Sequence, residues 1–369
     1  MKKYDTIIMV IVMDKERNYG IDALRIVSMF FVIILHCIGR GGILASTQVY
    51  SPQYKFAWIL EIIAYCAVNI FALISGYVSY KKTKLKSYIN LWFMVVYYCL
   101  LIVLFYQITN PSIITSKDYI ISFFPVTNNS YWYFTAYTGL FVLKPLLDKA
   151  VNNMDEVALR KLFYVIIGIF SIYGTITKGF GLGKGYSVIW LIILYLLGAI
   201  MSKCEIGKKI KGYQVIIGLF LLVLITYVTR IYWTDEIVFL KSNFNILVNA
   251  KTLVDYTSPS ILGIAILLLI GFSKIKFNNV FKKIISFGAS SAFAVYLINT
   301  HYLVWNNYML NLFKDLGNSS ILVIAYTVIG FAILFVVCSI LIDKVRIYLF
   351  KILKVNVIGE KLDNKLMKR

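Results

Sequence analysis

The sequence G-I-D-A-L-R-I-V-S-M-F-F-V-I-I-L-H-C-I, residues 20–38, is apolar enough for a membrane helix and yet carries Asp22, Arg25 and His36. At about 100° per residue, these three side chains project within roughly 60° of one another. Arg25 and His36 would lie about 16 Å apart along the helix axis. Because ionisable groups in hydrocarbon are costly, such a stripe normally faces a bundle interior or a water-filled cavity and has a function. The alternative is that Asp22 and Arg25 lie at the membrane interface and that His36 hydrogen-bonds a neighbouring helix.

The composition is that of a polytopic membrane protein. Hydrophobic residues make up 60% of the chain and charged residues only 15%, which excludes an ordinary soluble globular protein. Apolar stretches of membrane-spanning length are spread along the whole sequence and leave no room for a soluble domain. The predicted fold is an all-α membrane helix bundle formed by residues 20–342, with a cytoplasmic segment at 1–19 and a basic cytoplasmic tail at 343–369. Met13 resembles a natural start, so residues 1–12 are interpreted as an extension of the reading frame.

Ten membrane-spanning helices are predicted, near residues 20–38, 56–79, 88–108, 131–148, 162–177, 187–201, 213–231, 253–272, 284–309 and 320–342. With the N-terminus in the cytoplasm, 28 of the 38 Lys and Arg residues fall in cytoplasmic segments and 9 in outer segments. This asymmetry is the known signal for membrane topology and predicts that both termini are cytoplasmic. It also accounts for the net charge of +21 without a nucleic-acid partner. The basic stretch 344–354 is predicted to form an amphipathic helix at the interface rather than an eleventh span.

The sequence predicts neither a disulfide framework nor a metal site. Its five cysteines show no paired spacing, and four of them lie inside apolar segments. With two histidines and no Cys/His cluster, metal binding has little support. No tightly bound cofactor is expected.

Several polar residues are predicted to share one depth in the outer half of the membrane, at ~1.5 Å of rise per residue. They are His36, Glu61, Asp255, Asn299 and His301. A histidine held by a carboxylate is a suitable general base near neutral pH, so His36 is predicted to be the base and Glu61 its orienting partner. Alternatively, Glu61 is a structural partner of a buried amide. Trp132 and Tyr133 at the same level are either part of an aromatic belt or a platform for a sugar.

The inner side of the predicted bundle is basic. Asp22 and Arg25 would lie near the cytoplasmic mouth, beside Lys82, Lys84 and Lys86. Basic side chains at a mouth suit a polyanionic ligand that arrives from the cytoplasm. For any single lysine, the alternative is a purely topological role.

Six motifs give the chain a resemblance to the acyltransferase-3 family, the integral-membrane acyltransferases that modify cell-surface polysaccharides and related glycoconjugates. They follow the family order along nearly the whole chain, with a matching number of spans. The motifs are D-A-L-R with a histidine eleven residues after its arginine (22–36), F-A-L-I-S-G-Y (71–77), Y-W-Y-F (131–134), K-P-L-L (144–147), Y-T-S-P (256–259) and S-F-G-A-S-S-A-F-A-V-Y-L-I-N (286–299).

The resemblance implies that an acyl group, usually acetyl, passes from cytoplasmic acyl-CoA to a hydroxyl of a cell-surface or lipid-linked glycan in the cell membrane. Acetyl-CoA would be the donor substrate, and His36 and Arg25 would be the functional pair. The CoA phosphates would dock at the basic inner mouth. There the family often has arginines, whereas this chain has lysines, which attract phosphate without the bidentate fork.

A second departure lies in the ninth span, where the family has Y-L-I-H and this chain has Asn299. His301 follows two residues later, but two residues rotate a helical side chain by about 200°, so His301 cannot simply replace the family's histidine. The substrate is expected to contact Asp22, Ser75, Trp132, Tyr133, Asp255, Tyr296, Asn299 and His301.

Two other functions compete with this one. A transporter or flippase of a glycan or lipid precursor would use the polar layer as a translocation site, but transporters often contain inverted repeats and no repeat is visible here. An inactive relative that serves as a scaffold is the other alternative, which the departure at Asn299 keeps open.

Overall fold

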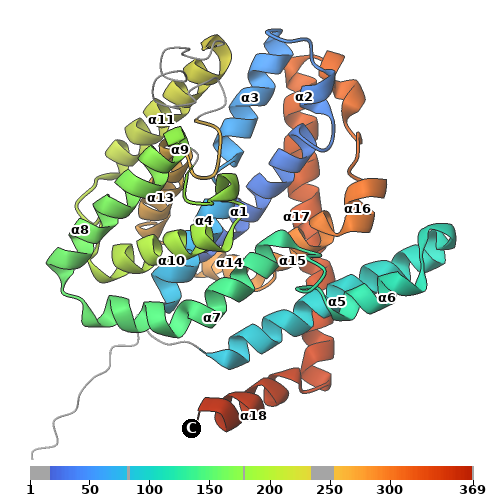
Figure 1. Cartoon of the computed structure of the whole chain (residues 1–369). Helices are drawn as coiled ribbons and strands as arrows, with labels where there is room; N and C mark the ends of the chain where they lie inside the picture. The colour runs from blue at the N-terminus through green and yellow to red at the C-terminus, as the bar shows by residue number, and fades with distance from the viewer. Residues whose placement is uncertain (1–16, 81–83, 178, 234–252, 368–369) are drawn as a thin grey trace, which may run out of the picture.

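The computed structural model describes residues 17–80, 84–177, 179–233 and 253–367, and every regular element in these ranges is a helix (Figure 1). The all-α prediction is therefore confirmed. The first half contains α1 (Tyr19–Ile38), α2 (Ile43–Ser46), α3 (Pro52–Ala64), α4 (Ala67–Ser79), α5 (Leu85–Thr109), η1 (Pro111–Ile113), α6 (Ser116–Phe123), α7 (Trp132–Asn153), α8 (Glu156–Ile166), η2 (Ile167–Tyr173) and α9 (Gly174–Thr177).

The second half contains η3 (Gly183–Gly185), α10 (Val188–Lys203), α11 (Gly212–Tyr232), α13 (Pro259–Ser273), α14 (Asn279–Ala289), α15 (Ala292–Thr300), α16 (Tyr302–Asn307), η4 (Lys314–Asn318), α17 (Ile321–Ile352) and α18 (Val355–Met367). Each of the ten predicted spans coincides with a helix or with an interrupted run of helices.

By length and composition, seven helical stretches of the described chain could cross a membrane, as expected of a multi-pass membrane protein. They are Tyr19–Ser46, Pro52–Ser79, Leu85–Thr109, Glu156–Thr177, Gly212–Tyr232, Asn279–Thr300 and Ile321–Ile352. The apolar helices α10 and α13 are shorter. Ten crossings and the cytoplasmic location of both termini remain predictions.

Helix α1 is the centre of the bundle. The side chain of Asn18 caps its start by accepting a hydrogen bond from the backbone N–H of Ile21. Around it pack α3, α4, α13, α14, α15 and α17. Helix α1 is therefore surrounded by helices drawn from most of the chain.

Helices α4 and α10 pack with their backbones in contact. A Cβ atom on Gly76 would lie 1.9 Å from the carbonyl oxygen of Tyr195, and one on Gly198 would lie 2.0 Å from the carbonyl oxygen of Leu73. Close approach through small residues is the usual way in which helices associate inside membranes. This contact fixes α4, which forms one wall of the site described below.

Three of the predicted spans are interrupted. The second breaks at Tyr65 and Cys66, between α3 and α4, and the ninth breaks before α15 and again at His301. The fifth contains the wide-turned helix η2, a form that is rare and often found at functional sites. Such breaks are tolerated in a membrane only where other groups satisfy the freed backbone, and the second and ninth spans both contribute residues to the cavity described below.

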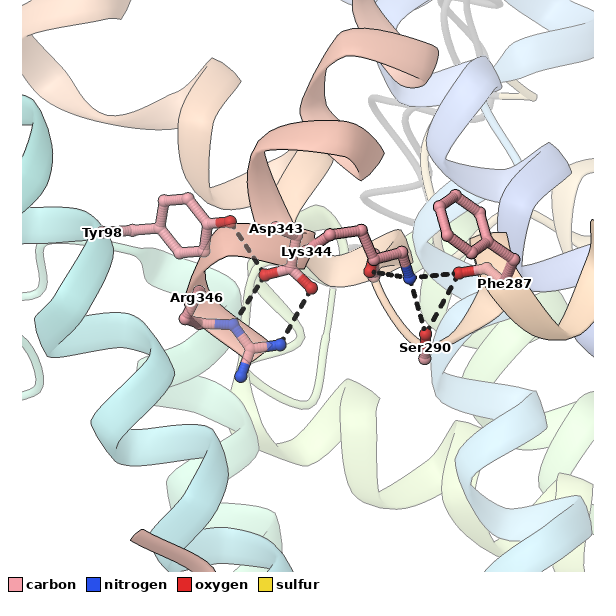
Figure 2. Close-up of polar contacts among 7 residues, drawn as sticks. Tyr98, Phe287, Ser290, Asp343, Lys344 and Arg346 are labelled. Carbon is pink, nitrogen blue, oxygen red and sulfur yellow. Dashed lines mark hydrogen bonds and ion pairs between the residues drawn. The ribbon is translucent and has the colours of Figure 1, made fainter. Parts of the chain in front are cut away.

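The basic stretch 344–354 does not form the separate interfacial helix that was predicted. Instead α17 continues without a break to Ile352, and α18 follows it and packs on α5. The continuation is stabilised by a buried ion pair, which Figure 2 shows. Arg346 donates two hydrogen bonds of 2.6 and 2.8 Å to Asp343, which also accepts one from Tyr98 of α5 at 2.8 Å.

Lys344 extends from α17 in the opposite direction, to the end of α14 (Figure 2). Its ammonium group donates to the carbonyl oxygen of Phe287 and, at 2.9 Å, to the hydroxyl of Ser291. Phe287 lies in the last turn of α14 and Ser291 follows that turn, where a cation is favoured by the helix dipole. The charges of this stretch therefore join α17 to α5 and to α14, which explains why the helix does not end at residue 342.

Candidate functional site

A cavity of about 370 Å³ lies against the second half of α1. Helices α1, α4, α15 and α16, the segment that leads into α7 and two tyrosines from loops form its walls. Its lining residues are Met29, Val32, Leu35, His36, Ala67, Val68, Phe71, Asn129, Ser130, Trp132, Tyr133, Tyr186, Tyr256, Phe293, Tyr296, Thr300, Tyr302 and Trp305. The lining is thus mainly aromatic, and His36 is its one ionisable group apart from tyrosine hydroxyls.

His36 is held on two sides. Its Nδ1 shares a short hydrogen bond with Oδ1 of Asn299, and its ring meets the Trp305 ring edge-on with the centroids 4.6 Å apart. An amide oxygen can only accept, so Nδ1 carries the proton and Nε2 keeps its lone pair. In this tautomer, Nε2 is the nitrogen that can accept a proton.

The partner of His36 corrects the sequence-based expectation. Glu61 was predicted to orient the ring, but in the described part of the chain His36 forms its hydrogen bond with Oδ1 of Asn299, and Glu61 does not line the cavity. Asn299 is completely buried, and its Nδ2 has no hydrogen-bond partner in the described structure. The residue that departs from the family pattern is therefore the one that contacts His36.

Trp305 is fixed by contacts outside the cavity. Arg40 donates a 3.1 Å hydrogen bond from Nε to the carbonyl oxygen of Trp305, and its guanidinium lies 5.3 Å from the centre of the Trp305 ring. Arg40 also donates to the side chain of Asn306 at 2.6 Å. The loop after α1 thereby positions α16, and α16 in turn positions the ring beside His36.

Tyr302 is fixed from α6. Its hydroxyl donates a 2.5 Å hydrogen bond to Asp118, which also accepts from the backbone N–H and hydroxyl of Thr115. Burial opposes ionisation of the Asp118 carboxyl, but the hydrogen bonds from Tyr302 and Thr115 outweigh it and lower the pKa of Asp118 below its usual value. The carboxylate therefore stays charged and keeps α6 joined to the cavity wall.

Three aromatic rings from separate segments meet at one side of the cavity. The centroids of Trp132 and Tyr186 lie 4.6 Å apart, and those of Tyr186 and Tyr256 lie 5.1 Å apart. Trp132 and Tyr256 are roughly parallel, at an interplanar angle of 24°. Tyr186 is half exposed, whereas Tyr256 is buried. Such a group of rings can contact the apolar faces of a sugar or an acyl chain.

The segment that carries Tyr256 is held by buried hydrogen bonds. Nδ2 of Asn69 donates to the carbonyl oxygen of Tyr256 at 2.7 Å, while its Oδ1 accepts from the indole of Trp190. The carbonyl oxygen of Thr257 accepts from Ser171 in η2 and from Thr175 in α9. The wide turns of η2 thus place a hydroxyl where it holds the loop that supplies a cavity wall.

Stacked rings from α4 and α15 line one end of the cavity. Phe71 of α4 and Phe293 of α15 lie with their centroids 5.8 Å apart at an interplanar angle of 24°. Tyr133 contacts both rings, and the backbone N–H of Tyr133 donates to the hydroxyl of Tyr296. Met29 of α1 lines the same region. We call Met29, Phe71 and Phe293 the cavity floor.

Arg25 lies one turn of α1 beyond the floor and does not line the cavity. Its guanidinium donates to Oδ1 of Asp22 at 2.6 Å, and Oδ2 of Asp22 accepts from Arg17 at the same distance. Each carboxylate oxygen of Asp22 therefore accepts a hydrogen bond from one arginine, so Asp22 links Arg17 to Arg25. Lys282 and Arg17 each lie 5.4 Å from the ring centre of Tyr19, so three cations gather at the start of α1.

Of the three lysines predicted at the inner mouth, the structure describes Lys84 and Lys86. Lys86 pairs with Glu360 of α18, and Lys84 is exposed just before α5. Lys82 lies outside the described residues. In the described chain, the cations beside Arg25 come from residues before α1 and from α14.

Other predicted site residues flank the cavity without lining it. Ser75 donates to the carbonyl oxygen of Phe71 within α4, and His301 is buried beside Tyr131, with their ring centroids 6.2 Å apart. Asp255 and Glu61 both interact electrostatically with Tyr186. Trp132, Tyr133 and Tyr296 do line the cavity with His36. Within the described residues, no group of three His, Cys, Asp or Glu side chains could hold a metal ion.

Sequence reasoning missed six aromatic residues of the wall, two of which are Phe71 and Tyr302. Phe293 and Tyr256 lie inside motifs quoted above, but other residues of those motifs were chosen as site candidates. Tyr186 ends the glycine-rich run G-L-G-K-G-Y, a turn signal that could have marked a loop entering the site. Trp305 follows the polar run Asn299–His301, which could have indicated the break between α15 and α16.

Comparison with protein families gives one finding. A model of the acyltransferase-3 family, described as an acyltransferase domain, matches residues 18–343. Neither the curated proteins nor the solved structures gave a match. The matched range begins at the cap of α1 and ends at Asp343, so it includes every residue of the cavity.

Proposed function

Because the chain belongs to the acyltransferase-3 family, and is thus a membrane acyltransferase, we propose that it transfers an acetyl group from cytoplasmic acetyl-CoA to a hydroxyl of a cell-surface or lipid-linked glycan. The observation that carries the proposal is the hydrogen bond that holds His36 as a base inside an aromatic cavity. The cell membrane is the proposed location.

His36 performs the proton transfer. Its Nε2 removes the proton of the acceptor hydroxyl while the oxygen attacks the thioester carbonyl carbon. The C–S bond then breaks, the ester remains on the acceptor, and the thiolate of CoA takes the proton from the imidazolium. Asn299 keeps Nδ1 protonated throughout and accepts a stronger hydrogen bond when the ring is charged.

The donor approaches from the start of α1. The phosphates of CoA bind the cations of Arg17, Arg25 and Lys282, for which Asp22 sets the position of the two guanidinium groups. From Arg25 to His36 is about 16 Å along the helix, a distance that the extended pantetheine arm covers. The thioester must pass between the rings of the floor, so the floor opens during each turnover.

The acceptor approaches from the opposite end of the cavity. Trp132, Tyr186 and Tyr256 offer ring faces for the apolar side of a sugar. Asn129 and Ser130 at the rim supply polar groups. A hydroxyl directed past these rings meets His36.

The test uses purified protein in lipid nanodiscs with radiolabelled acetyl-CoA and oligosaccharide acceptors. Wild-type protein should release CoA and label the acceptor, and His36→Ala should lower the rate by at least about 100-fold. Both proteins should reach the same membrane level and thermal transition, because His36 is not part of the tightly packed floor.

Cells provide the second readout. Deletion of the gene should remove O-acetyl signals from the surface glycans in NMR spectra. Undiminished acetylation by His36→Ala would refute the role of His36. Binding of oligosaccharide without any turnover of acetyl-CoA would instead return the transport function to consideration.

A further inference from the structure

The cavity has two chemically different walls. Its aliphatic lining residues all belong to α1 or to the first turn of α4, and they are Met29, Val32, Leu35, Ala67 and Val68. Apart from Phe71, its aromatic lining residues come from α7, α15, α16 and two loops. Met29 already belongs to the cavity floor, and we call the other four the aliphatic wall. The proposed function gives the ring faces to a sugar and leaves the aliphatic wall without a ligand.

On α1, the aliphatic wall leads from the cavity floor to His36. Val32 and Leu35 follow the floor residue Met29 at intervals of three residues, each about 4.5 Å of rise, and His36 is the next residue. The acceptor oxygen must lie about 3 Å from Nε2 of His36, and the carbonyl carbon that it attacks about 3 Å further. The reacting acyl group is therefore within about one helical turn of His36, which is the level of Val32 and Leu35.

The other half of the aliphatic wall exists because the second span is broken. Helix α4 begins directly after Cys66, so its first two residues, Ala67 and Val68, line the cavity about one turn from the floor residue Phe71. Helices α1 and α4 pack against each other. Ala67 is completely buried, as are all but small fractions of the two α1 residues, whereas Val68 is only partly buried. Closely packed side chains leave little depth for a ligand, and Val68 is the member with free surface.

The charges around the cavity favour an uncharged ligand. Among the described residues that line the cavity, none is Lys, Arg, Asp or Glu. The nearest arginines on α1 and its following loop do not line the cavity: Arg25 donates to Asp22, and Arg40 donates to the carbonyl oxygen of Trp305 and to Asn306. Nε2 of His36 must keep its lone pair to act as a base, so it cannot pair with a carboxylate. A carboxylate on the acyl group would thus be buried without a partner, which is costly.

We propose that the aliphatic wall holds the acyl group of the donor thioester, that it admits only short uncharged acyl groups, and that Val68 sets the permitted length. This inference rests on the proposed function and deepens it by naming the residues that select the acyl group. The sulfur lies on the side of the floor, the carbonyl carbon lies beside His36, and the alkyl end packs on the aliphatic wall. The acceptor sugar occupies the aromatic wall, so the selectivities for donor and acceptor can be altered separately.

Donor selectivity is measured with the full-length protein in nanodiscs, as kcat/KM for acetyl-, propionyl-, butyryl- and succinyl-CoA with one oligosaccharide acceptor. The wild type should prefer acetyl-CoA at least 10-fold over butyryl-CoA and at least 100-fold over succinyl-CoA. Val68→Ala should raise the ratio of butyryl to acetyl transfer at least 10-fold, because it removes two methyl groups from the wall. Val68→Leu should lower the ratio of propionyl to acetyl transfer at least 5-fold.

Two controls separate selection from a structural role. Val78→Ala changes an exposed residue of the same helix outside the cavity lining and should leave both ratios within 2-fold of the wild type. Trp132→Leu, on the aromatic wall, should raise KM for the acceptor at least 5-fold without changing the donor ratios. A structural role of Val68 would lower kcat/KM for every donor by the same factor, so the ratios would not move. Equal ratios in the wild type, Val68→Ala and Val68→Leu therefore reject the aliphatic wall as the acyl site, and use of succinyl-CoA as fast as acetyl-CoA rejects the restriction to uncharged groups.

Binding gives a readout that does not require turnover. The probes are the thioethers S-ethyl-CoA and S-butyl-CoA, which carry an alkyl chain and no transferable acyl group, and equilibrium dialysis measures their affinities. Val68→Ala should increase the affinity for S-butyl-CoA relative to S-ethyl-CoA at least 5-fold. This change together with no acyl transfer by the wild type from any donor would reject the proposed function and retain the wall as an alkyl site. An unchanged relative affinity with no transfer would reject both.

Discussion

Asn299 shows how much a single residue contributes to the site. It occupies the position where the family has a histidine, and it gives His36 an acceptor that cannot ionise. A neutral acceptor fixes the tautomer of His36 as a histidine partner could, and it adds no charge to the cavity. Under the proposed function, the departure from the family pattern therefore still leaves His36 with a partner that orients its ring.

Substitutions at Asn299 test this interpretation. Asn299→Leu keeps the approximate volume but removes the acceptor, and we expect kcat to fall about 100-fold because the ring loses its fixed tautomer. KM for acetyl-CoA should change less than 2-fold. Asn299→Asp retains an acceptor oxygen and should keep kcat within about 10-fold of the wild type.

The control is Asn279→Leu, an exposed position at the start of α14 that is remote from the cavity lining. Initial rates with radiolabelled acetyl-CoA give both constants. Equal kcat values for Asn299→Leu and Asn299→Asp would show that the hydrogen bond to His36 does not matter for catalysis.

The residue scale also shows the limit of sequence reasoning. The spacing of Arg25 and His36 placed both on one face of α1, but helical spacing carries no information about which residue of another helix reaches His36. Depth in the membrane was the available guide, and it ranked Glu61 and Asn299 equally. Charge favoured Glu61, whereas the structure pairs His36 with Asn299.

Among the elements, the contact between α4 and α10 is the most constrained. Gly76→Ala and Gly198→Ala should each destabilise the protein by about 3 kcal/mol, because the new methyl group meets a backbone carbonyl that cannot move without separating the helices. Thermal unfolding in detergent measures the change. Activity should fall as well, since α4 carries the floor residue Phe71.

Two other helical glycines are the matched controls. A Cβ on Gly168 or Gly330 would have no heavy atom within 4 Å. Gly168→Ala and Gly330→Ala should therefore leave the unfolding temperature unchanged or raise it slightly, because alanine has the higher helix propensity. A similar loss of stability in all four variants would mean that α4 and α10 are not packed as described.

Helix α6 should detach from the cavity wall in acid. The pKa of Asp118 is lowered in the folded protein, so its carboxylate contributes fully to stability above the ordinary pKa of about 3.9, and the contribution is lost as pH falls through the lower folded value. Hydrogen exchange of the α6 amides, corrected for the intrinsic rate, should accelerate as pH falls below about 3.9.

Asp118→Asn should remove this acid-dependent acceleration, whereas Lys117→Gln on the same helix should retain it. The neutral side chain keeps a hydrogen bond to Tyr302 that does not titrate. Acceleration of equal size in Asp118→Asn would assign the effect to another group.

Existence of the helices was predictable, and their interruptions were not. A continuous apolar run such as 56–79 has the composition of a single span, and hydropathy does not distinguish it from two helices that meet at Tyr65 and Cys66. The direction of α17 beyond residue 342 depended on the pairing of Asp343 with Arg346 and Tyr98, a contact between distant parts of the sequence. Tertiary contacts decided each of these cases.

At the scale of the whole molecule, the distribution of charge predicts which ends of the helices face the cytoplasm. A membrane-impermeant maleimide added to intact cells should label Lys117→Cys, in a predicted outer segment, and should not label Lys209→Cys, in a predicted cytoplasmic one. Both positions are exposed. The background is Cys338→Ser, because Cys338 is the exposed one of the five cysteines.

Permeabilised cells supply the control, since Lys209→Cys should then react as well. Labelling of both positions in intact cells, or of Lys209→Cys alone, would overturn the assignment of the two sides. The order of approach of donor and acceptor would be reversed with it.

The ring pair of the cavity floor bears on proton leakage across the membrane. A membrane that maintains a proton gradient cannot contain a permanently open, water-filled channel. A channel that joined Arg25 to His36 would dissipate that gradient. Phe71 stacks on Phe293 at this end of the cavity lining. Under the proposed function, the donor thioester displaces these rings on its way to His36, so the rings would limit proton leakage between turnovers.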